Sequence, residues 1–134
     1  MNQRANLSKT EAKIMKFMWA AKKPVVLSEV KAYFREEYQK EYANSTIHTL
    51  LQRMVAKGYI AQGERYIAFS GYSYSCLVSE EEYLLQQLNQ CRDVHFGGSA
   101  CQFIVSLLQT QEITAEEQDR IQECMDELRR RSGR

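Results

Sequence analysis

The sequence lacks the features that mark membrane, secreted and metal-binding proteins. No stretch approaches the roughly 20 apolar residues of a membrane-spanning helix, and residues 1–10 contain no apolar run of signal-peptide length. We therefore expect a cytoplasmic protein without membrane insertion. The cysteines form no CxxC or CxC pair, so we expect no metal site and no cofactor. We interpret them as small buried apolar side chains, with redox or metal sensing as the alternative: Cys76, Cys91, Cys101 and Cys124.

Patterns typical of catalysis are also missing. There is no nucleophile with a matching base, no carboxylate pair in a shared motif and no glycine-rich phosphate loop. A chain of 134 residues suits one compact domain, or a small domain with an extension. Its 44% hydrophobic and 26% charged residues are typical of a folded globular protein. We therefore expect a folded protein that is not an enzyme.

The net charge of +1 hides an uneven distribution. Residues 1–77 carry 12 Lys and Arg against 6 Asp and Glu, which gives +6, whereas residues 78–134 carry 6 against 11, which gives −5. A basic segment attracts polyanions such as the DNA backbone, and an acidic helical segment is better suited to self-association. The asymmetry predicts two halves with different functions.

The basic half begins with two predicted helices. Ser8 and Glu11 are spaced as a capping box, and Pro24 stops the helix that follows. A short extended segment comes next. Ser28 is then the expected N-cap of a second helix, which ends near Lys40.

A third helix and a hairpin complete this half. We expect Asn44 or Ser45 to cap the helix and Gly58 to close it. Its apolar residues follow the spacing of a helix with one buried face: Ile47, Leu50, Leu51, Met54 and Val55. Aromatic and β-branched residues, interrupted by Gly63 and Ser70-Gly71, then predict two paired strands: Tyr59, Ile60, Tyr66, Ile67, Phe69, Tyr72 and Tyr74.

The acidic half predicts three more amphipathic helices and no strand. Capping boxes at Ser79/Glu82 and Thr114/Glu117 open two of them, and the loop at residues 96–99 separates the first from the second. Three apolar stripes without a sheet need an opposing surface, so we expect a second copy of the chain to cover them; packing against the first half is the alternative. The residues expected in the dimer contact are Leu84, Leu88, Phe96, Phe103, Ile104, Leu107, Leu108, Ile121, Met125 and Leu128.

The predicted fold is therefore mainly α with a small β-hairpin. Residues 1–77 form a winged helix-turn-helix DNA-binding domain, and residues 78–134 form a three-helix dimerisation domain. In a winged helix the third helix enters the major groove of double-stranded DNA and the hairpin touches the backbone.

The polar face of the third helix is expected to read base edges, with these residues: Ser45, Thr46, His48, Thr49, Gln52 and Arg53. The expected backbone contacts are Lys9, Thr10, Asn44, Lys57 and Arg65. A dimer would place two such helices on successive major-groove faces of a pseudo-palindromic operator. A winged-helix module for protein assembly, with a solvated helix face in the same place, stays open as the alternative.

Four segments of the chain, which follow one another in the same order as in the family, resemble the BlaI/MecI/CopY penicillinase-repressor family. Residues 46–60 resemble its recognition helix, residues 7–11 with Met15 and Trp19 its first helix, residues 74–82 its hairpin exit and residues 96–99 its C-terminal domain. The resemblance spans about residues 7–130 and implies a homodimeric winged-helix repressor with intertwined C-terminal helices.

The resemblance also implies how repression ends. Family members release DNA when a membrane sensor protease cuts the C-terminal domain, which corresponds here to Gln102 and Phe103, or when metal changes in copper-responsive relatives. This chain has Gln102 in place of the family's asparagine, Cys76 in place of a proline, and no paired CxC motif at its end. The missing motif argues against copper control, but the four thiols keep a redox- or metal-responsive repressor of the same fold as a second alternative.

Overall fold

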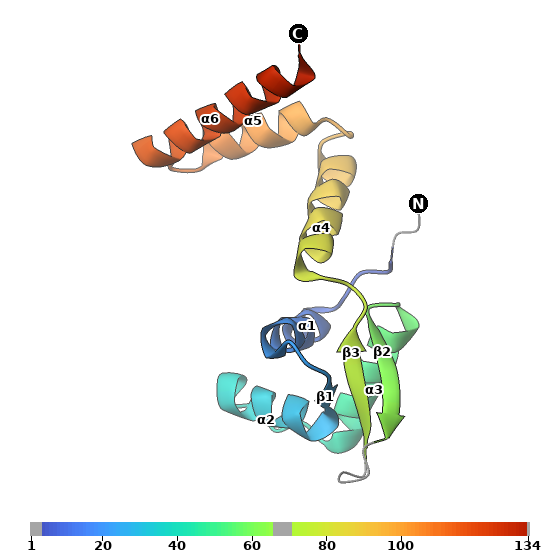
Figure 1. Cartoon of the computed structure of the whole chain (residues 1–134). Coiled ribbons are helices and arrows are strands. Elements are labelled where there is room, and N and C mark those ends of the chain that lie inside the picture. Colours follow the sequence, from blue (N-terminus) through green and yellow to red (C-terminus); the bar gives the residue numbers. More distant parts are fainter. Residues whose placement is uncertain (1–3, 66–70, 134) are drawn as a thin grey trace. The chain divides into compact units, whose positions relative to one another are not determined.

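The computed structural model describes residues 4–65 and 71–133. Its elements follow in the order α1 (Lys9–Ala21), β1 (Val25–Val26), α2 (Leu27–Tyr38), α3 (Asn44–Ala56), β2 (Ile60–Arg65), β3 (Tyr72–Cys76), α4 (Glu80–His95), α5 (Ala100–Thr110) and α6 (Ala115–Ser132) (Figure 1). This is the predicted mainly-α winged-helix fold. Among the described residues, no helix is long and apolar enough to span a membrane.

The capping boxes expected at the starts of α1, α4 and α6 are confirmed. The N-caps expected for α2 and α3 are wrong. α2 begins before Ser28, and the carboxylate of Glu29 accepts a hydrogen bond from the backbone N–H of Val26 at 2.9 Å. Ala43 is the N-cap of α3, so Asn44 lies in its first turn and no side chain caps the helix.

A three-stranded antiparallel sheet with the order β1–β3–β2 packs beside the three helices (Figure 1). The two predicted strands are present, and β1 adds a third because Val25 pairs with Tyr74. α3 ends at Ala56, and its C-cap is Lys57. The next residue, Gly58, has a φ of +87°, which favours glycine and stops the helix. Four residues expected in or beside the hairpin lie outside the described residues: Tyr66, Ile67, Phe69 and Ser70.

One hydrophobic core joins the helices to the sheet. α1, α2 and α3 each bury one stripe, as their 3.6-residue periodicity requires. Tyr59, Tyr74 and Val78 close the core from the sheet side. The buried apolar side chains of the helices are Ile14, Met15, Met18, Val30, Phe34, Ile47, Leu51 and Met54.

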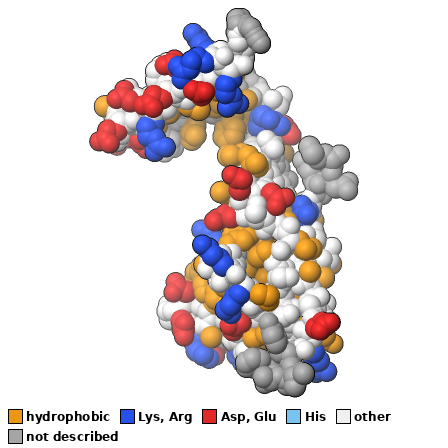
Figure 2. All heavy atoms as spheres, in the orientation of Figure 1, with side chains coloured by type: hydrophobic (Ala, Val, Ile, Leu, Met, Phe, Trp, Pro, Cys, Tyr) orange, Lys and Arg blue, Asp and Glu red, His pale blue; other side chains and the backbone are white. Residues whose placement is uncertain are grey.

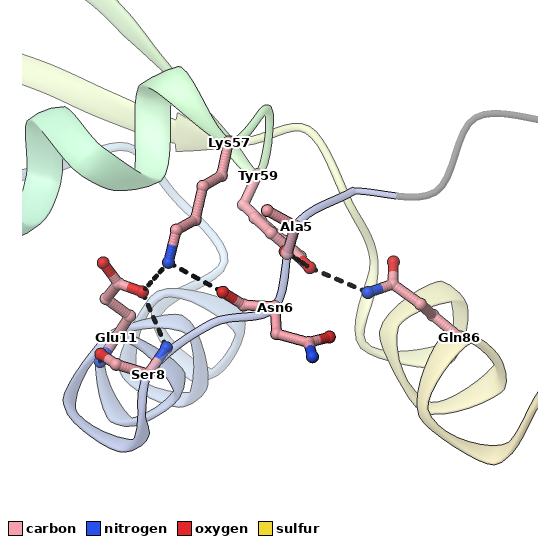
Figure 3. A network of polar contacts seen from close by, with 7 residues as sticks. All are labelled: Ala5, Asn6, Ser8, Glu11, Lys57, Tyr59 and Gln86. Carbon is pink, nitrogen blue, oxygen red and sulfur yellow. Dashed lines mark hydrogen bonds and ion pairs between the residues drawn. The ribbon is translucent and has the colours of Figure 1, made fainter. Parts of the chain in front are cut away.

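The start of α4 packs on this core. Trp19 is half-buried at the edge of the core, and its indole N–H donates to the carbonyl of Val78 at 2.9 Å. Gln86 of α4 donates to the hydroxyl of Tyr59 at 2.9 Å (Figure 3). Residues 1–87 form one compact unit and residues 88–134 form a second. The functional division expected after Leu77 stays a prediction.

The second unit leaves its apolar side chains uncovered. Neither α5 nor α6 has a buried side chain. Phe96 and Phe103 are half-buried because their rings stack at a centroid distance of 5.2 Å. Figure 2 shows hydrophobic side chains on the surface of these helices. The unit therefore retains apolar area that folding of one chain does not remove from water.

Candidate nucleic-acid interface

The polar face of α3 is exposed, as its periodicity predicts. Ile47, Leu51 and Met54 are buried on the opposite face. Four of the expected base-reading residues also line a hollow of about 280 Å³ beside Leu50. Of the six expected base-reading residues, five are exposed: Ser45, Thr46, His48, Thr49 and Arg53.

Thr49 uses its hydroxyl proton within the helix. The hydroxyl donates to the carbonyl of Ser45 at 2.9 Å, one turn earlier. Its oxygen can still accept a hydrogen bond, and its methyl group can contact an apolar group such as the methyl of thymine. Arg53, one turn further along, contributes a guanidinium that can bond guanine or a phosphate.

Gln52 differs from the other expected base-readers because it contacts the sheet. Its side-chain amide N–H donates to Oε1 of Gln62 on β2 at 2.7 Å and to the hydroxyl of Tyr74 on β3 at 3.4 Å. Burial raises the pKa of Tyr74, which keeps the hydroxyl neutral. The contacts fix α3 to the sheet, so we expect Gln52 to position the helix as well as face the DNA side.

Lys57, an expected phosphate contact, is engaged within the protein. Its ammonium lies 2.7 Å from Oε1 of Glu11 and 2.8 Å from the carbonyl of Asn6, to which it donates (Figure 3). The Glu11 side chain is 1% exposed. If the ammonium of Lys57 moved away, the buried carboxylate would lose its counter-charge, which would cost several kcal/mol of stability. The sequence alone hid this pairing because Glu11 precedes Lys57 by 46 residues.

Glu11 is held as a carboxylate by these contacts. Burial acts to raise its pKa, but the hydrogen bond from Lys57 and the backbone N–H of Ser8 outweigh burial, so the pKa is lowered. The distance from the Ser8 nitrogen to Oε1 of Glu11 is 2.8 Å. One carboxylate therefore serves both the cap of α1 and the link to the end of α3.

The other expected backbone contacts lie at three places in the first unit. Lys9 is exposed in the first turn of α1, and Thr10 is half-buried beside it. Oδ1 of Asn44 accepts a hydrogen bond from Nζ of Lys31 at 3.0 Å. The guanidinium of Arg65 lies 5.6 Å from the centre of the Tyr72 ring.

Sequence reasoning missed the basic side chains that accompany Asn44. Lys31 and Arg35 on α2 line a hollow with Asn44. The available signal was their i, i+4 spacing along the flank of the buried stripe of Val30 and Phe34.

The cysteines do not form the buried set that was expected. Cys101 and Cys124 are exposed, and Cys76 and Cys91 are half-buried. Burial raises the pKa of the Cys76 thiol, so this thiol is less reactive than a free one. Within residues 4–65 and 71–133, no cluster of three or more His, Cys, Asp or Glu side chains could hold a metal ion.

A helical triplet with a three-stranded sheet, and a third helix whose polar face is exposed, defines a winged-helix DNA-binding protein. The chain matches the penicillinase repressor family over residues 7–127, and it belongs to that family. It is therefore a DNA-binding transcriptional repressor. No curated protein matches the chain.

Proposed function

We propose that the chain is a homodimeric, sequence-specific repressor that occludes a pseudo-palindromic operator with two copies of α3. The observation that carries the proposal is the exposed face of α3, which has hydroxyls, an imidazole and a guanidinium but no carboxylate. The major groove of B-DNA is about 12 Å wide and admits a helix with its side chains. Carboxylates on such a face would be repelled by the flanking phosphates.

The side chains of α3 provide different kinds of readout. Arg53 can bond the O6 and N7 acceptors of guanine, and the methyl group of Thr49 can pack on that of thymine. Ser45 and Thr46 stand in the first turn, where helix N–H groups also face outward. Gln52 keeps the helix fixed to β2 and β3 while the others contact bases.

A second copy of the chain is proposed to cover the apolar faces of the C-terminal helices. All ten residues expected in that contact are at least partly exposed, and Leu84 and Leu107 are 53% and 51% exposed. Leu85 and Val94 of α4 and Val105 of α5 are also exposed. Such a concentration of apolar side chains marks an interaction surface. Residues 78–134 carry a net charge of −5, which disfavours DNA as the occupant.

Release by proteolysis at residues 102–103 is proposed as the end of repression. Gln102 is exposed in the first turn of α5, where its backbone N–H donates to the hydroxyl of Ser99. Phe103 stacks on Phe96. A cut between Gln102 and Phe103 would detach most of α5 and all of α6 from the rest of the chain. Mass spectrometry of chain recovered from derepressed cells should then find fragments 1–102 and 103–134; only intact chain would contradict this mode of release.

The DNA-reading role of α3 is tested by fluorescence anisotropy with Thr49→Ala and Arg53→Ala. The probes are a duplex carrying the chain's own promoter and a scrambled duplex of equal length. Each variant should lose about 1–3 kcal/mol of binding free energy on the promoter and much less on the scrambled duplex.

Thr110→Ala is the matched control. Its hydroxyl donates to the carbonyl of Ser106, one turn earlier on α5, as that of Thr49 does on α3. Thr110→Ala should bind like the unmodified chain. Unchanged selectivity in both Thr49→Ala and Arg53→Ala would contradict the role of α3 and favour a protein-assembly module.

A further inference from the structure

A hollow beside α3 has the composition of an anion site. It has a volume of about 540 Å³ and lies between the start of α2, the first residue of α3 and the glycine that precedes β3. Lys31, Arg35, Ser28 and Asn44 supply its polar lining, and Gly71 supplies backbone without a side chain. Of the described residues, two cations and no carboxylate line it.

The two cations of the hollow are not paired with a carboxylate of the described residues. Nζ of Lys31 is held at 3.0 Å by the neutral amide oxygen of Asn44, not by a carboxylate. Arg35 lies one turn further along the same face of α2 and is exposed. Among the described residues, neither side chain takes part in an ion pair. An anion that entered the hollow would therefore be the first to neutralise them.

The position of the hollow selects the kind of anion. Asn44 lines it, and the next residue, Ser45, lines the hollow on the reading face of α3. A helix of about 10–12 Å diameter fills a major groove of similar width, so phosphates at the groove edge lie against the elements that flank the helix. α2 flanks the start of α3 here, since Lys31 of α2 donates to Asn44.

We propose that Lys31 and Arg35, with Asn44, bind a backbone phosphodiester of DNA at the edge of the groove that α3 enters. This inference rests on the proposed function and adds the residues that fix the register of α3. Hydrogen bonds between ionised donors and phosphate oxygens are short and strong, and a guanidinium can bond two oxygens at once. A phosphate contact of this kind positions the protein without reading sequence.

The test measures DNA affinity against salt concentration for Lys31→Ala and Arg35→Ala on the promoter and scrambled duplexes. Each variant should lower the slope of log affinity against log salt by about one and weaken binding about five-fold at 0.15 M salt. Because a phosphate contact is independent of sequence, both duplexes should be affected equally. Arg35→Gln should behave like Arg35→Ala.

Lys16→Ala is the control for the loss of one positive charge. Lys16 is exposed on α1 and lines neither hollow, so it should leave the slope unchanged. Circular dichroism of each variant verifies that it is folded. Unchanged slopes for folded Lys31→Ala and Arg35→Ala would overturn the phosphodiester site but not the proposed function. Binding of free phosphate without a contribution to DNA binding would also overturn the site. Losses confined to the promoter duplex would overturn it too, and failure of the unmodified chain to bind either duplex would overturn the proposed function with it.

Discussion

The ion pair between Glu11 and Lys57 links the start of α1 to the residue after α3. Its carboxylate is 1% exposed and its ammonium 25% exposed. The pair between Lys23 and Glu29 has side chains that are 58% and 39% exposed. Removing one partner of a buried pair leaves an uncompensated charge, whereas an exposed pair is screened by water and salt. The two ion pairs therefore differ in what their loss would cost.

Lys57→Ala should lower the free energy of unfolding by about 3 kcal/mol, because Glu11 then lacks its counter-charge. Urea unfolding followed by circular dichroism measures the change. Lys23→Ala is the exposed control and should cost less than about 1 kcal/mol. Glu11→Gln combined with Lys57→Ala should recover part of the loss, since Gln retains the cap without a charge. A double variant as unstable as the sum of the single ones would contradict the pairing.

Glu11 also predicts how stability depends on pH. Its pKa is lowered in the folded state, so its contribution is present above the usual value near 4.5 and is lost as pH falls through the folded value. The melting temperature of the unmodified chain should exceed that of Glu11→Gln at pH 7. This difference in melting temperature should shrink as the pH is lowered below 5. A difference that is constant with pH would show that the carboxylate charge is not what stabilises the fold.

At the scale of elements, α3 begins without a side-chain cap. Ala43 has the extended backbone of an N-cap, with φ −68° and ψ 153°, but no hydrogen-bonding side chain. α1, α5 and α6 have Ser8, Ser99 and Thr114 at the corresponding position. Ser or Asp at position 43 would satisfy one N–H of the first turn. The added group would also stand next to the proposed DNA surface.

Ala43→Ser and Ala43→Asp should both raise the free energy of unfolding by about 1 kcal/mol. Their effects on DNA binding should differ. Ala43→Asp places a negative charge near the phosphates and should weaken binding to either duplex, whereas Ala43→Ser should not. Urea unfolding and anisotropy titrations measure the two properties. Equal DNA affinity of the two variants would contradict the orientation of α3 toward DNA.

The elements that the sequence predicted best are those set by local chemistry. Ser8 and Glu11 lie three residues apart, so their capping box can be recognised without knowledge of the fold. The apolar spacing of α3 likewise predicted which side of the helix is buried. β1 was harder to predict, because a strand of two residues is specified by its pairing with β3 and not by its own pattern.

The candidate site depends more on contacts between distant residues. The composition of the exposed face of α3 could be predicted from its periodicity alone. The engagement of Lys57 by Glu11, and of Gln52 by Gln62 and Tyr74, follows from how α1, α3 and the sheet pack. Isolated charges in a sequence cannot show whether a partner 46 residues away neutralises them.

At the scale of the whole molecule, the charge and the apolar surface are divided between the two ends of the chain. Residues 1–77 carry +6 and expose the polar face of α3, and residues 78–134 carry −5 and expose leucines on every helix. Attraction to DNA and hydrophobic association therefore belong to different segments. Operator recognition by a dimer requires both, since two copies of α3 must be held together to occupy two half-sites.

Leu107→Asp should convert the dimer to a monomer, because a carboxylate in an apolar contact has no partner to offset its desolvation. Light scattering at micromolar concentration measures the mass. Leu77→Asp is the control, because Leu77 is 55% exposed but lies outside the three C-terminal helices. It should remain dimeric. A Leu107→Asp variant with unchanged mass would place the dimer contact elsewhere.

Operator recognition by a dimer is tested most directly by the mass of the complex between the unmodified chain and its promoter duplex, measured by light scattering. We expect two chains per duplex, and we expect Leu107→Asp to bind the same duplex more weakly and as single chains. One chain per duplex for the unmodified protein, with affinity equal to that of Leu107→Asp, would contradict a repressor that recognises its operator as a dimer.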